Sequence, residues 1–495
     1  MAEGNKEVKI CPTRNLDIKE GDAVAYRKID QYILEELYGI IHDRRRVLTE
    51  EVDLLSYSFD ASLGSYQPEA VIQPLKASEI SMIVKLANKH KIPIYPRGQS
   101  TSLSGGPLPV RGGIVLDLSQ MKGKLEIHPN DLLAIVSPGV ITAEIHKAAE
   151  KHGLMYPPDP SSSSICTIGG NLAENSGGPR CLKYGVTKDY VLGLEMVTPK
   201  GDIVRTGGKT MKNVTGYDLT KLIVGSEGTL GIITEAILQL IPKPKSSETL
   251  LAAFSEIEKA GEAVSEILTS GLLPSKLEIM DQGCIQSVEA YSPSGLPLDA
   301  EAVLLIEVDG HPYATKEEIK ETAEKCREMG AELVKIASTI EESNQLWNAR
   351  KLISPAITRI KPTKISEDAT VPLSQIPEMF KRLKEIREKH NVSLVVCGHA
   401  GDGNLHPNII TDIRDREEMK RAEEAVAEIF SCAVELGGTL SGEHGIGTMK
   451  APFMEMELGK AGIELMVSIK KAWDPNNILN PGKIFPEPNL KFKLI

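Results

Sequence analysis

Two short clusters bounded by glycines hold the side chains most capable of chemistry. The first runs from His399 to His406 as His-Ala-Gly-Asp-Gly-Asn-Leu-His, and the second is Ser441-Gly442-Glu443-His444-Gly445. Two histidines and one carboxylate are a common way to hold a catalytic divalent metal with open coordination positions, and a fourth ionisable group then remains as a base. Helix packing does not call for imidazoles in glycine-bounded turns, so the two clusters predict a metal centre. Other histidines, at positions 42, 90, 128, 146, 152 and 311, are interpreted as surface groups or hydrogen-bonded core groups.

A second glycine-rich segment lies far upstream, at Arg97–Gly106, directly after the apolar run Ile92–Tyr95. It offers backbone N–H groups, hydroxyls and glycines in a tight turn, which suits a pyrophosphate. The segment is not the G-x-G-x-x-G fingerprint, and the chain has no P-loop G-K-[ST] motif. By itself the segment is equally compatible with an ordinary turn.

The whole chain sets broad limits on function. With 495 residues it is long enough for two or three domains, and its formal net charge of -11 argues against nucleic acid or an anionic membrane as the main partner. The N-terminus lacks the apolar core of a signal peptide, and no apolar run could cross a bilayer. We therefore expect a cytoplasmic protein that is peripheral to a membrane only through a partner. The seven cysteines form no C-x-x-C pair, which argues against a disulfide framework or a built-in iron–sulfur cluster.

The elements that must position the clusters alternate between strand and helix. A helix is expected over 26–41, and Ser78 is expected to cap another helix, whose apolar face begins at Ile80. After a proline-rich boundary at 241–244 come two β-α-β units. The first has strand 250–254, helix 257–269 and strand 277–280, and the second has strand 303–308, helix 316–329 and strand 333–336. Such units predict an antiparallel, ferredoxin-like sheet backed by helices. Long helices over 376–390 and 421–436 precede the two histidine clusters.

Several further blocks are recognisable, at 157–164, 166–178, 181–185, 213–219 and 225–233, and all but the first contain glycine. Together they resemble the FAD-binding domain of the vanillyl-alcohol oxidase and p-cresol methylhydroxylase (PCMH) type. Within it they are most similar to the FAD-linked 2-hydroxyacid dehydrogenases, which include the glycolate oxidase catalytic subunit, D-lactate dehydrogenase and D-2-hydroxyglutarate dehydrogenase. The resemblance extends from roughly residue 40 to 486. It implies an α+β fold, with a two-subdomain PCMH-type FAD-binding domain and a ferredoxin-like antiparallel-sheet substrate domain.

This resemblance gives a division of the chain. We expect a polar N-terminal extension over 1–25, the FAD-binding domain over 26–245, and the substrate domain over 246–440, of the FAD-linked oxidase C-terminal type. A C-terminal segment over 441–495 would return to the flavin.

The resemblance also implies FAD, held non-covalently because the histidine that carries the flavin in some relatives is missing from the Arg97–Gly106 loop. This loop would meet the pyrophosphate, residues 167–171 and 176–178 the ribityl chain and diphosphate, and residues 231–233 the adenine side. Ser100 stands where the family usually has glycine, so a positive φ there would strain the chain. The expected cofactor residues are Pro96, Arg97, Gly98, Gln99, Ser100, Thr101, Ser102, Ser104, Pro158, Asp159, Thr167, Gly169, Gly170, Asn171, Asn175, Gly177, Gly178, Tyr184, Gly185, Glu227, Gly228, Gly231, Ile233, Asn480 and Lys483.

In the family that the chain resembles, His399, His406 and Glu443 would bind one divalent metal, for which Zn²⁺, Fe²⁺ and Mn²⁺ all fit. His444 would take the hydroxyl proton of a D-2-hydroxy acid as hydride leaves for flavin N5. The resemblance further implies Arg350 as the group that binds the substrate carboxylate, and Asn408 is expected to hold a substrate oxygen.

The choice of substrate depends on the region that follows Arg350. The 2-hydroxyglutarate branch adds a hydroxyl and a lysine there. Ser354 and Lys364 lie near those places, but Lys364 is offset, and the segment 367–372 looks more like the glycolate and lactate branches. We therefore expect D-lactate or glycolate as substrate. A substrate with a second, distal carboxylate, such as 2-hydroxyglutarate, should bind poorly.

The resemblance leaves the electron acceptor open among electron-transfer flavoprotein, an iron–sulfur subunit and quinone reached through partners. The assembly stays open between a homodimer and a hetero-complex. The 1–25 extension is interpreted as a tail rather than a docking element. Two rival functions share the fold. One is the non-oxidative alkylglycerone-phosphate synthase branch, which needs a lipid tunnel for which the chain has no evident apolar signature. The other is a non-catalytic flavin subunit, which would lack the histidine clusters.

Overall fold

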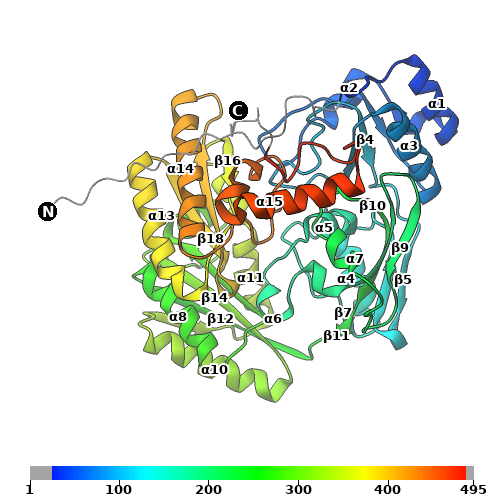
Figure 1. Ribbon diagram of the computed structural model, residues 1–495. Helices are drawn as coiled ribbons and strands as arrows, with labels where there is room; N and C mark the ends of the chain where they lie inside the picture. The colour runs from blue at the N-terminus through cyan, green and yellow to red at the C-terminus, as the bar shows by residue number, and fades with distance from the viewer. Residues whose placement is uncertain (1–24, 487–495) are drawn as a thin grey trace.

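The computed structural model describes residues 25–486, so all but the last residue of the predicted N-terminal extension lies outside the described residues. Three larger sheets and one two-stranded sheet organise this part of the chain (Figure 1). In the view of Figure 1 the largest sheet lies on the left and the two smaller ones on the right, with the long helix α15 running across the molecule between α14 and β10. Within residues 25–486 no helix is both long enough and apolar enough to span a membrane.

The first sheet has the strand order β1-β2-β4-β3, in which β2, β3 and β4 are parallel. Its strands are β1 (Val47–Leu48), β2 (Ala70–Ile72), β3 (Ile94–Arg97) and β4 (Ile114–Asp117), and its helices are α1 (Gln31–Ile41), α2 (Glu51–Ser56) and α3 (Ala77–His90). The predicted helix at 26–41 is confirmed, with its start at Gln31 after the N-cap Asp30. The predicted cap at Ser78 is wrong, because α3 already begins at Ala77 and Ser78 lies in its first turn. The apolar face of α3 packs on the sheet as expected.

The second sheet is antiparallel, in the order β5-β6-β10-β8-β9. Its strands are β5 (Leu125–His128), β6 (Leu133–Val136), β8 (Val191–Val197), β9 (Ile203–Gly207) and β10 (Ile232–Gln239). The short pair β7 (Leu154–Met155) and β11 (Ile241–Pro242) leads out of it. The associated helices are α4 (Thr142–Glu150), α5 (Ile168–Glu174), α6 (Cys181–Tyr184) and α7 (Leu219–Ile223).

The third sheet contains both predicted β-α-β units. β12 (Ser246–Phe254), α8 (Ile257–Thr269) and β13 (Lys276–Asp281) form the first, and β14 (Ala302–Gly310), α10 (Pro312–Glu328) and β15 (Leu333–Ile336) form the second. Their strands pair antiparallel in the order β15-β12-β14-β13, which confirms the ferredoxin-like expectation. The sheet then continues through β18 (Ser393–His399), β19 (Asn404–Thr411) and β16 (Thr363–Ser366), and β17 (Ala369–Thr370) also pairs with β19.

Helices cover both faces of this third sheet, because alternate residues of its strands are apolar on both sides. Leu250, Ala252 and Phe254 face a core shared with α8, α10, α13 (Ile376–His390) and α14 (Arg416–Glu435). Leu251 and Ala253 face a second core shared with α9 (Gln282–Tyr291), α11 (Ile340–Lys351) and α12 (Ile353–Ile357). Such continuous apolar strands are expected for a sheet buried on both faces.

After α15 (Met454–Trp473) the chain returns to the first sheet. Ile94 and Leu479 form a parallel bridge, and Asn480 donates its N–H to the carbonyl of Ile94 at 2.8 Å. The C-terminal segment therefore ties the third sheet to the parallel sheet.

Candidate active site

One cavity lies where the three sheets meet. The glycine-rich loop, the N-terminus of α5, the end of α11, the hairpin β18–β19 and the second histidine cluster all contribute to it. Among the residues that line it are Gly98–Leu103, Thr167, Gly170, Asn171, Glu174, Glu227, Arg350, Ser354, Lys364, Cys397, His406, Asn408, Glu443, His444 and Asn480. The two systems that the sequence singled out therefore face the same space.

The predicted metal ligands converge. His399 ends β18 and His406 lies on the paired strand β19, so a tight hairpin through Gly403 brings the two rings to a centroid distance of 4.9 Å. The Glu443 Oε1 atom lies 3.0 Å from His399 Nε2 and 3.3 Å from His406 Nε2. The three ligand atoms lie within 4.8 Å of one another. A His₂-carboxylate donor set gathered in this way fits a divalent metal.

Glu278 of β13 supports this cluster from behind. Its Oε1 atom is 2.6 Å from His399 Nδ1, and its Oε2 atom accepts from Arg350 Nε at 2.8 Å. Burial would lower the pKa of His399, but the carboxylates of Glu278 and Glu443 outweigh it and raise that pKa well above its usual value. Glu278 was not predicted from the sequence; a carboxylate inside the apolar strand Leu277–Met280 was the one available signal.

His444 lies beside the metal cluster, with its ring stacked on His406 at a centroid distance of 4.9 Å and an interplanar angle of 7°. Burial lowers the pKa of His444 to about 3, against the opposing effect of Asp368. The imidazole is therefore neutral near pH 7, as a proton acceptor must be.

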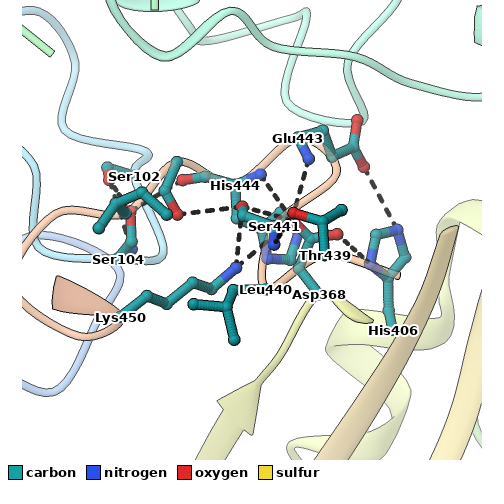
Figure 2. A network of polar contacts seen from close by, with 12 residues as sticks. Ser102, Ser104, Asp368, His406, Thr439, Leu440, Ser441, Glu443, His444 and Lys450 are labelled. Atoms are coloured by element: carbon teal, nitrogen blue, oxygen red, sulfur yellow. Dashed lines mark hydrogen bonds and ion pairs between the residues drawn. The ribbon is translucent and has the colours of Figure 1, made fainter. Parts of the chain in front are cut away.

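The loop that carries Glu443 and His444 is anchored at both ends (Figure 2). The backbone N–H groups of Glu443 and His444 each donate to Asp368 Oδ2 at 2.9 Å. Ser104 Oγ donates to the carbonyl of His444 at 2.8 Å, which joins the glycine-rich loop to the second histidine cluster. Glu227 accepts from the N–H groups of Ile446 and Gly447, so this predicted cofactor residue also holds the histidine loop.

Arg350 lies in the last turn of α11 and is buried against Glu278 while it lines the cavity. Asn408 also lines the cavity, and one N–H of its amide donates to the carbonyl of His406 at 2.7 Å.

Lys364, which is offset in the sequence from the lysine of the 2-hydroxyglutarate branch, lines the cavity. β16 pairs with β19, so Lys364 lies opposite Ile410 and reaches the cavity that Arg350 lines. The Lys364 Nζ atom donates to Ser354 Oγ at 2.9 Å, and burial lowers the pKa of this lysine. A second cation therefore stands near Arg350, which weakens the argument from sequence against a distal carboxylate.

The glycine-rich loop forms a cradle that side chains could not occupy. A Cβ atom on Gly98 would clash with Thr167 Oγ1, and Thr167 in turn caps α5 by accepting from the Gly170 N–H. Gly98 and Thr167 both line the cavity, and glycine at position 98 lets the loop approach Thr167 closely, as suits a diphosphate cradle. Ser100 has φ 58°, the left-handed conformation that was expected to strain a serine.

Thirteen of the predicted cofactor residues are not on the lining of this cavity. Arg97 donates to the carbonyls of Tyr57 and Phe59, Lys483 donates to the carbonyl of Leu108, and Tyr184 donates to Asp309. These three side chains shape the loops instead of facing the cavity. The full set is Arg97, Ser104, Pro158, Asp159, Gly169, Asn175, Gly177, Gly178, Tyr184, Gly185, Gly231, Ile233 and Lys483, whereas Pro96, Gly98, Gln99, Ser100, Thr101, Ser102, Thr167, Gly170, Asn171, Glu227, Gly228 and Asn480 line it.

Residues 68–207 match a family described as FAD binding domain, and residues 243–484 match FAD linked oxidases, C-terminal domain. Among characterised sequences, glycolate oxidase subunit GlcD of Bacillus subtilis (strain 168) is 53% identical over 87% of this chain and 92% of its own length. D-lactate dehydrogenase of Archaeoglobus fulgidus is 38% identical over 87% of this chain and 95% of its own length.

Two solved structures show the same fold. p-Cresol methylhydroxylase with substrate bound superposes with a TM-score of 0.76 at 19% identity, over 95% of this chain and 100% of its own. Alkyldihydroxyacetonephosphate synthase superposes with a TM-score of 0.71 at 20% identity, over 93% and 86%.

Proposed function

The chain belongs to the FAD-linked oxidases of the PCMH-type flavoprotein superfamily, as an FAD-dependent 2-hydroxyacid oxidoreductase, and from that premise we propose that it oxidises D-lactate or glycolate to the 2-oxo acid with the help of one divalent metal. The observation that carries the proposal is that Arg350, His444, His406 and Glu443 line one cavity with the glycine-rich cradle, while His399 completes the cluster with His406 and Glu443.

Each group then has a defined task. Arg350, already oriented by Glu278, would bind the substrate carboxylate through its remaining N–H groups. The metal, held by His399, His406 and Glu443, would lower the pKa of the substrate hydroxyl. His444, neutral near pH 7, would take the hydroxyl proton. Bound along the glycine-rich cradle, FAD would supply the acceptor for the hydride of the substrate carbon.

D-2-hydroxyglutarate is the second candidate substrate, and the position of Lys364 favours it. The Lys364 ammonium and Ser354 hydroxyl lie on the same cavity as Arg350, so they could receive a second carboxylate. The Lys364→Met variant separates the candidates: its KM would rise for D-2-hydroxyglutarate and stay unchanged for D-lactate and glycolate.

The electrons must leave through a partner. The B. subtilis relative is named as an oxidase subunit. We infer that this chain likewise works in a hetero-complex, with electron-transfer flavoprotein or an iron–sulfur subunit as acceptor. The alternative on the same fold is the non-oxidative exchange chemistry of alkyldihydroxyacetonephosphate synthase, which would leave the flavin oxidised at the end of the reaction.

The test is the absorbance of the flavin under anaerobic conditions during titration with D-lactate, glycolate and D-2-hydroxyglutarate. We expect one of these acids to bleach the flavin band, a chelator to abolish the bleaching, and added Zn²⁺, Fe²⁺ or Mn²⁺ to restore it. His444→Gln should slow the bleaching by roughly 10²–10⁴-fold, whereas the variant His152→Gln, at an exposed histidine, should behave like the wild type. A flavin that stays oxidised with all three acids would exclude the proposal in favour of the non-oxidative alternative.

A further inference from the structure

Three buried polar atoms without hydrogen-bond partners converge behind the metal cluster. They are Asp368 Oδ1, His406 Nδ1 and His444 Nδ1. Asp368, His406 and His444 each bring one side-chain nitrogen or carboxylate oxygen to within 4.8 Å of the others, and Asp368 Oδ1 is 3.8 Å from His406 Nδ1. Unpartnered buried polar atoms are rare, so three of them facing one another call for a shared explanation.

The other oxygen of Asp368 is fully engaged, which fixes the orientation of the carboxylate. Oδ2 accepts from Ser441 Oγ at 2.8 Å, from the N–H groups of Glu443 and His444, and from Lys450 Nζ at 3.4 Å (Figure 2). Lys450 also donates to Ser441 Oγ at 2.9 Å. With Oδ2 held by four donors, Oδ1 is directed at the two stacked imidazoles.

A carboxylate that accepts from an ammonium and two backbone N–H groups is an acceptor at both oxygens. Oδ1 is therefore satisfied only by ring nitrogens that carry hydrogen, either directly or through one water molecule. In a neutral imidazole a hydrogen on Nδ1 leaves the lone pair on Nε2. The His406 Nε2 atom is the one beside Glu443 in the metal cluster. For His444, Nδ1 is buried while the ring lines the cavity, so Nε2 is the nitrogen available there.

We propose that Asp368 is a positioning residue that holds both His406 and His444 in the Nδ1–H form. One carboxylate would thus present His406 Nε2 to the metal and His444 Nε2 to the substrate hydroxyl at the same time. This inference rests on the proposed function for the roles of the two Nε2 atoms, but the hydrogen positions themselves can be tested without any substrate.

A second metal ion on Asp368, His406 and His444 is the competing explanation for the three atoms. It would require His406 to bridge two cations as an imidazolate. It would also place a further positive charge near Lys450, which already neutralises Asp368. The observed charges favour hydrogen over a second metal.

The decisive variant is Asp368→Asn. Its amide oxygen must face the N–H groups of Glu443 and His444, so its NH₂ group points at the two rings as a donor. Both histidines should then switch to the Nε2–H form, which can neither bind the metal nor accept the proton. The readout is ¹⁵N NMR of the FAD-loaded protein labelled at histidine, recorded once with Zn²⁺ and once without metal. Without metal, the ¹⁵N chemical shifts of the ring nitrogens distinguish the two tautomers. We expect Nδ1–H for His406 and His444 in the wild type, and Nε2–H in the metal-free variant.

Metal retention and turnover should follow the tautomers. Asp368→Asn should lower Zn²⁺ affinity by about 10–100-fold, as expected for a lost carboxylate partner of a histidine ligand. Flavin reduction at saturating metal should slow by on the order of 10³–10⁴-fold, as when the analogous substitution forces the wrong tautomer on a catalytic histidine.

Two further variants separate positioning from folding. Glu367→Gln changes the neighbouring buried carboxyl group, which does not line the cavity, and should leave tautomers, Zn²⁺ affinity and turnover as in the wild type. Lys450→Met removes the ammonium but keeps Oδ1, so it should lower the melting temperature while both histidines keep Nδ1–H.

The proposal is overturned if Nδ1 of His406 and His444 carries no hydrogen in the wild type, or if Asp368→Asn leaves both tautomers unchanged. It is also overturned if the wild type binds two metal ions and the Asp368→Asn variant binds one. Tautomers that depend on Asp368 in a protein that no 2-hydroxy acid can reduce would retain this inference and reject the proposed function.

Discussion

Arg350 is held from one side and open on the other, which suits a group that binds an anion. Its Nε atom donates to the fully buried Glu278, which in turn contacts His399. Lysine at this position could not keep both the contact with Glu278 and a two-pronged contact with a carboxylate. Arg350→Lys should therefore raise KM for the 2-hydroxy acid by about 10–100-fold, with a smaller effect on kcat. Steady-state kinetics with an artificial dye acceptor measure both constants. The surface variant Arg359→Lys is the control, and an unchanged KM for Arg350→Lys would remove Arg350 from the substrate site.

Ser100 offers a separate test at the scale of one backbone angle. Its φ of 58° disfavours a side chain, and its Oγ donates to the carbonyl of Phe59 at a long 3.3 Å. Ser100→Gly should leave the protein equally stable or up to about 1 kcal/mol more stable. Ser100→Ala should be less stable than the wild type, because it keeps the strain and loses the hydrogen bond. Thermal melting of the two variants decides; a glycine variant that is less stable than the alanine variant would contradict the argument from strain.

Residues that act through local spacing could be predicted, whereas those that depend on strand register could not. His399 and His406 are close in the sequence, so the hairpin between them was foreseeable. Glu278 lies 121 residues from His399 and meets it only because β13 pairs with β18. Asp368 was noticed in the sequence only as a feature of the substrate branch. Its contact with the 441–450 loop depends on where β17 places it, for which the sequence has no local signal.

At the scale of elements, helix periodicity located the long helices well and their ends less well. The prediction for 376–390 is confirmed residue for residue, since the apolar spacing covers the whole helix. The helix expected at 421–436 begins at Arg416, because Asp415 caps it and accepts from the N–H groups of Glu417 and Glu418. Capping residues that lie in a charged stretch do not stand out in the sequence.

Asp281 joins two elements and gives stability a dependence on pH. Its Oδ1 atom accepts from the Cys284 N–H and caps α9, and its Oδ2 atom accepts from the Val396 N–H on β18. Burial raises the pKa of Asp281 from 3.8 to about 6, although both N–H groups oppose the rise. The folded protein thus binds more protons than the unfolded chain between these pKa values, so this group's contribution to stability is present below about pH 4 and is lost as pH rises through about 6.

Asp281→Ala should therefore flatten the fall in unfolding free energy between pH 4 and 6.5. At pH 7 it should also destabilise the protein by about 1–3 kcal/mol through the lost cap and the unpaired Val396 N–H. Urea unfolding at several pH values measures both effects. Asp415→Ala, which removes a cap from α14 alone, should cost about 1 kcal/mol at pH 7. The same pH profile in wild type and Asp281→Ala would rule out this titration.

For the whole molecule, the return of the chain after α15 depends on one buried ion pair. Lys470 Nζ donates to Asp474 Oδ2 at 2.6 Å and to the carbonyls of Thr229 and Leu479. Lys470→Met would leave a buried carboxylate and two carbonyls without this donor, at a cost of about 3–5 kcal/mol. Because Asn480 follows and bonds to the carbonyl of Gly106, FAD should also dissociate faster. Urea unfolding and the release of flavin fluorescence measure the two effects. The variant Lys460→Met, at an exposed lysine, should show neither the loss of stability nor the faster release of FAD. A Lys470→Met protein as stable as the wild type would show that the ion pair does not hold the segment after α15 in place.

The placement of the site on the chain also bears on how this fold could acquire new substrates. Arg350, Ser354 and Lys364 come from one continuous stretch, whereas the cradle comes from loops more than 150 residues earlier. Natural or engineered substitutions could therefore replace the stretch that binds the 2-hydroxy acid and leave the FAD cradle unchanged. This replacement is limited by Asp368, which lies just after Lys364. Asp368 accepts from the His444 N–H and so holds a loop from a separate part of the chain. A graft that carries Asp368 must also match Ser441 and Lys450. Substitutions that change the substrate are therefore free of this constraint only at residues that do not contact Asp368 or its partners.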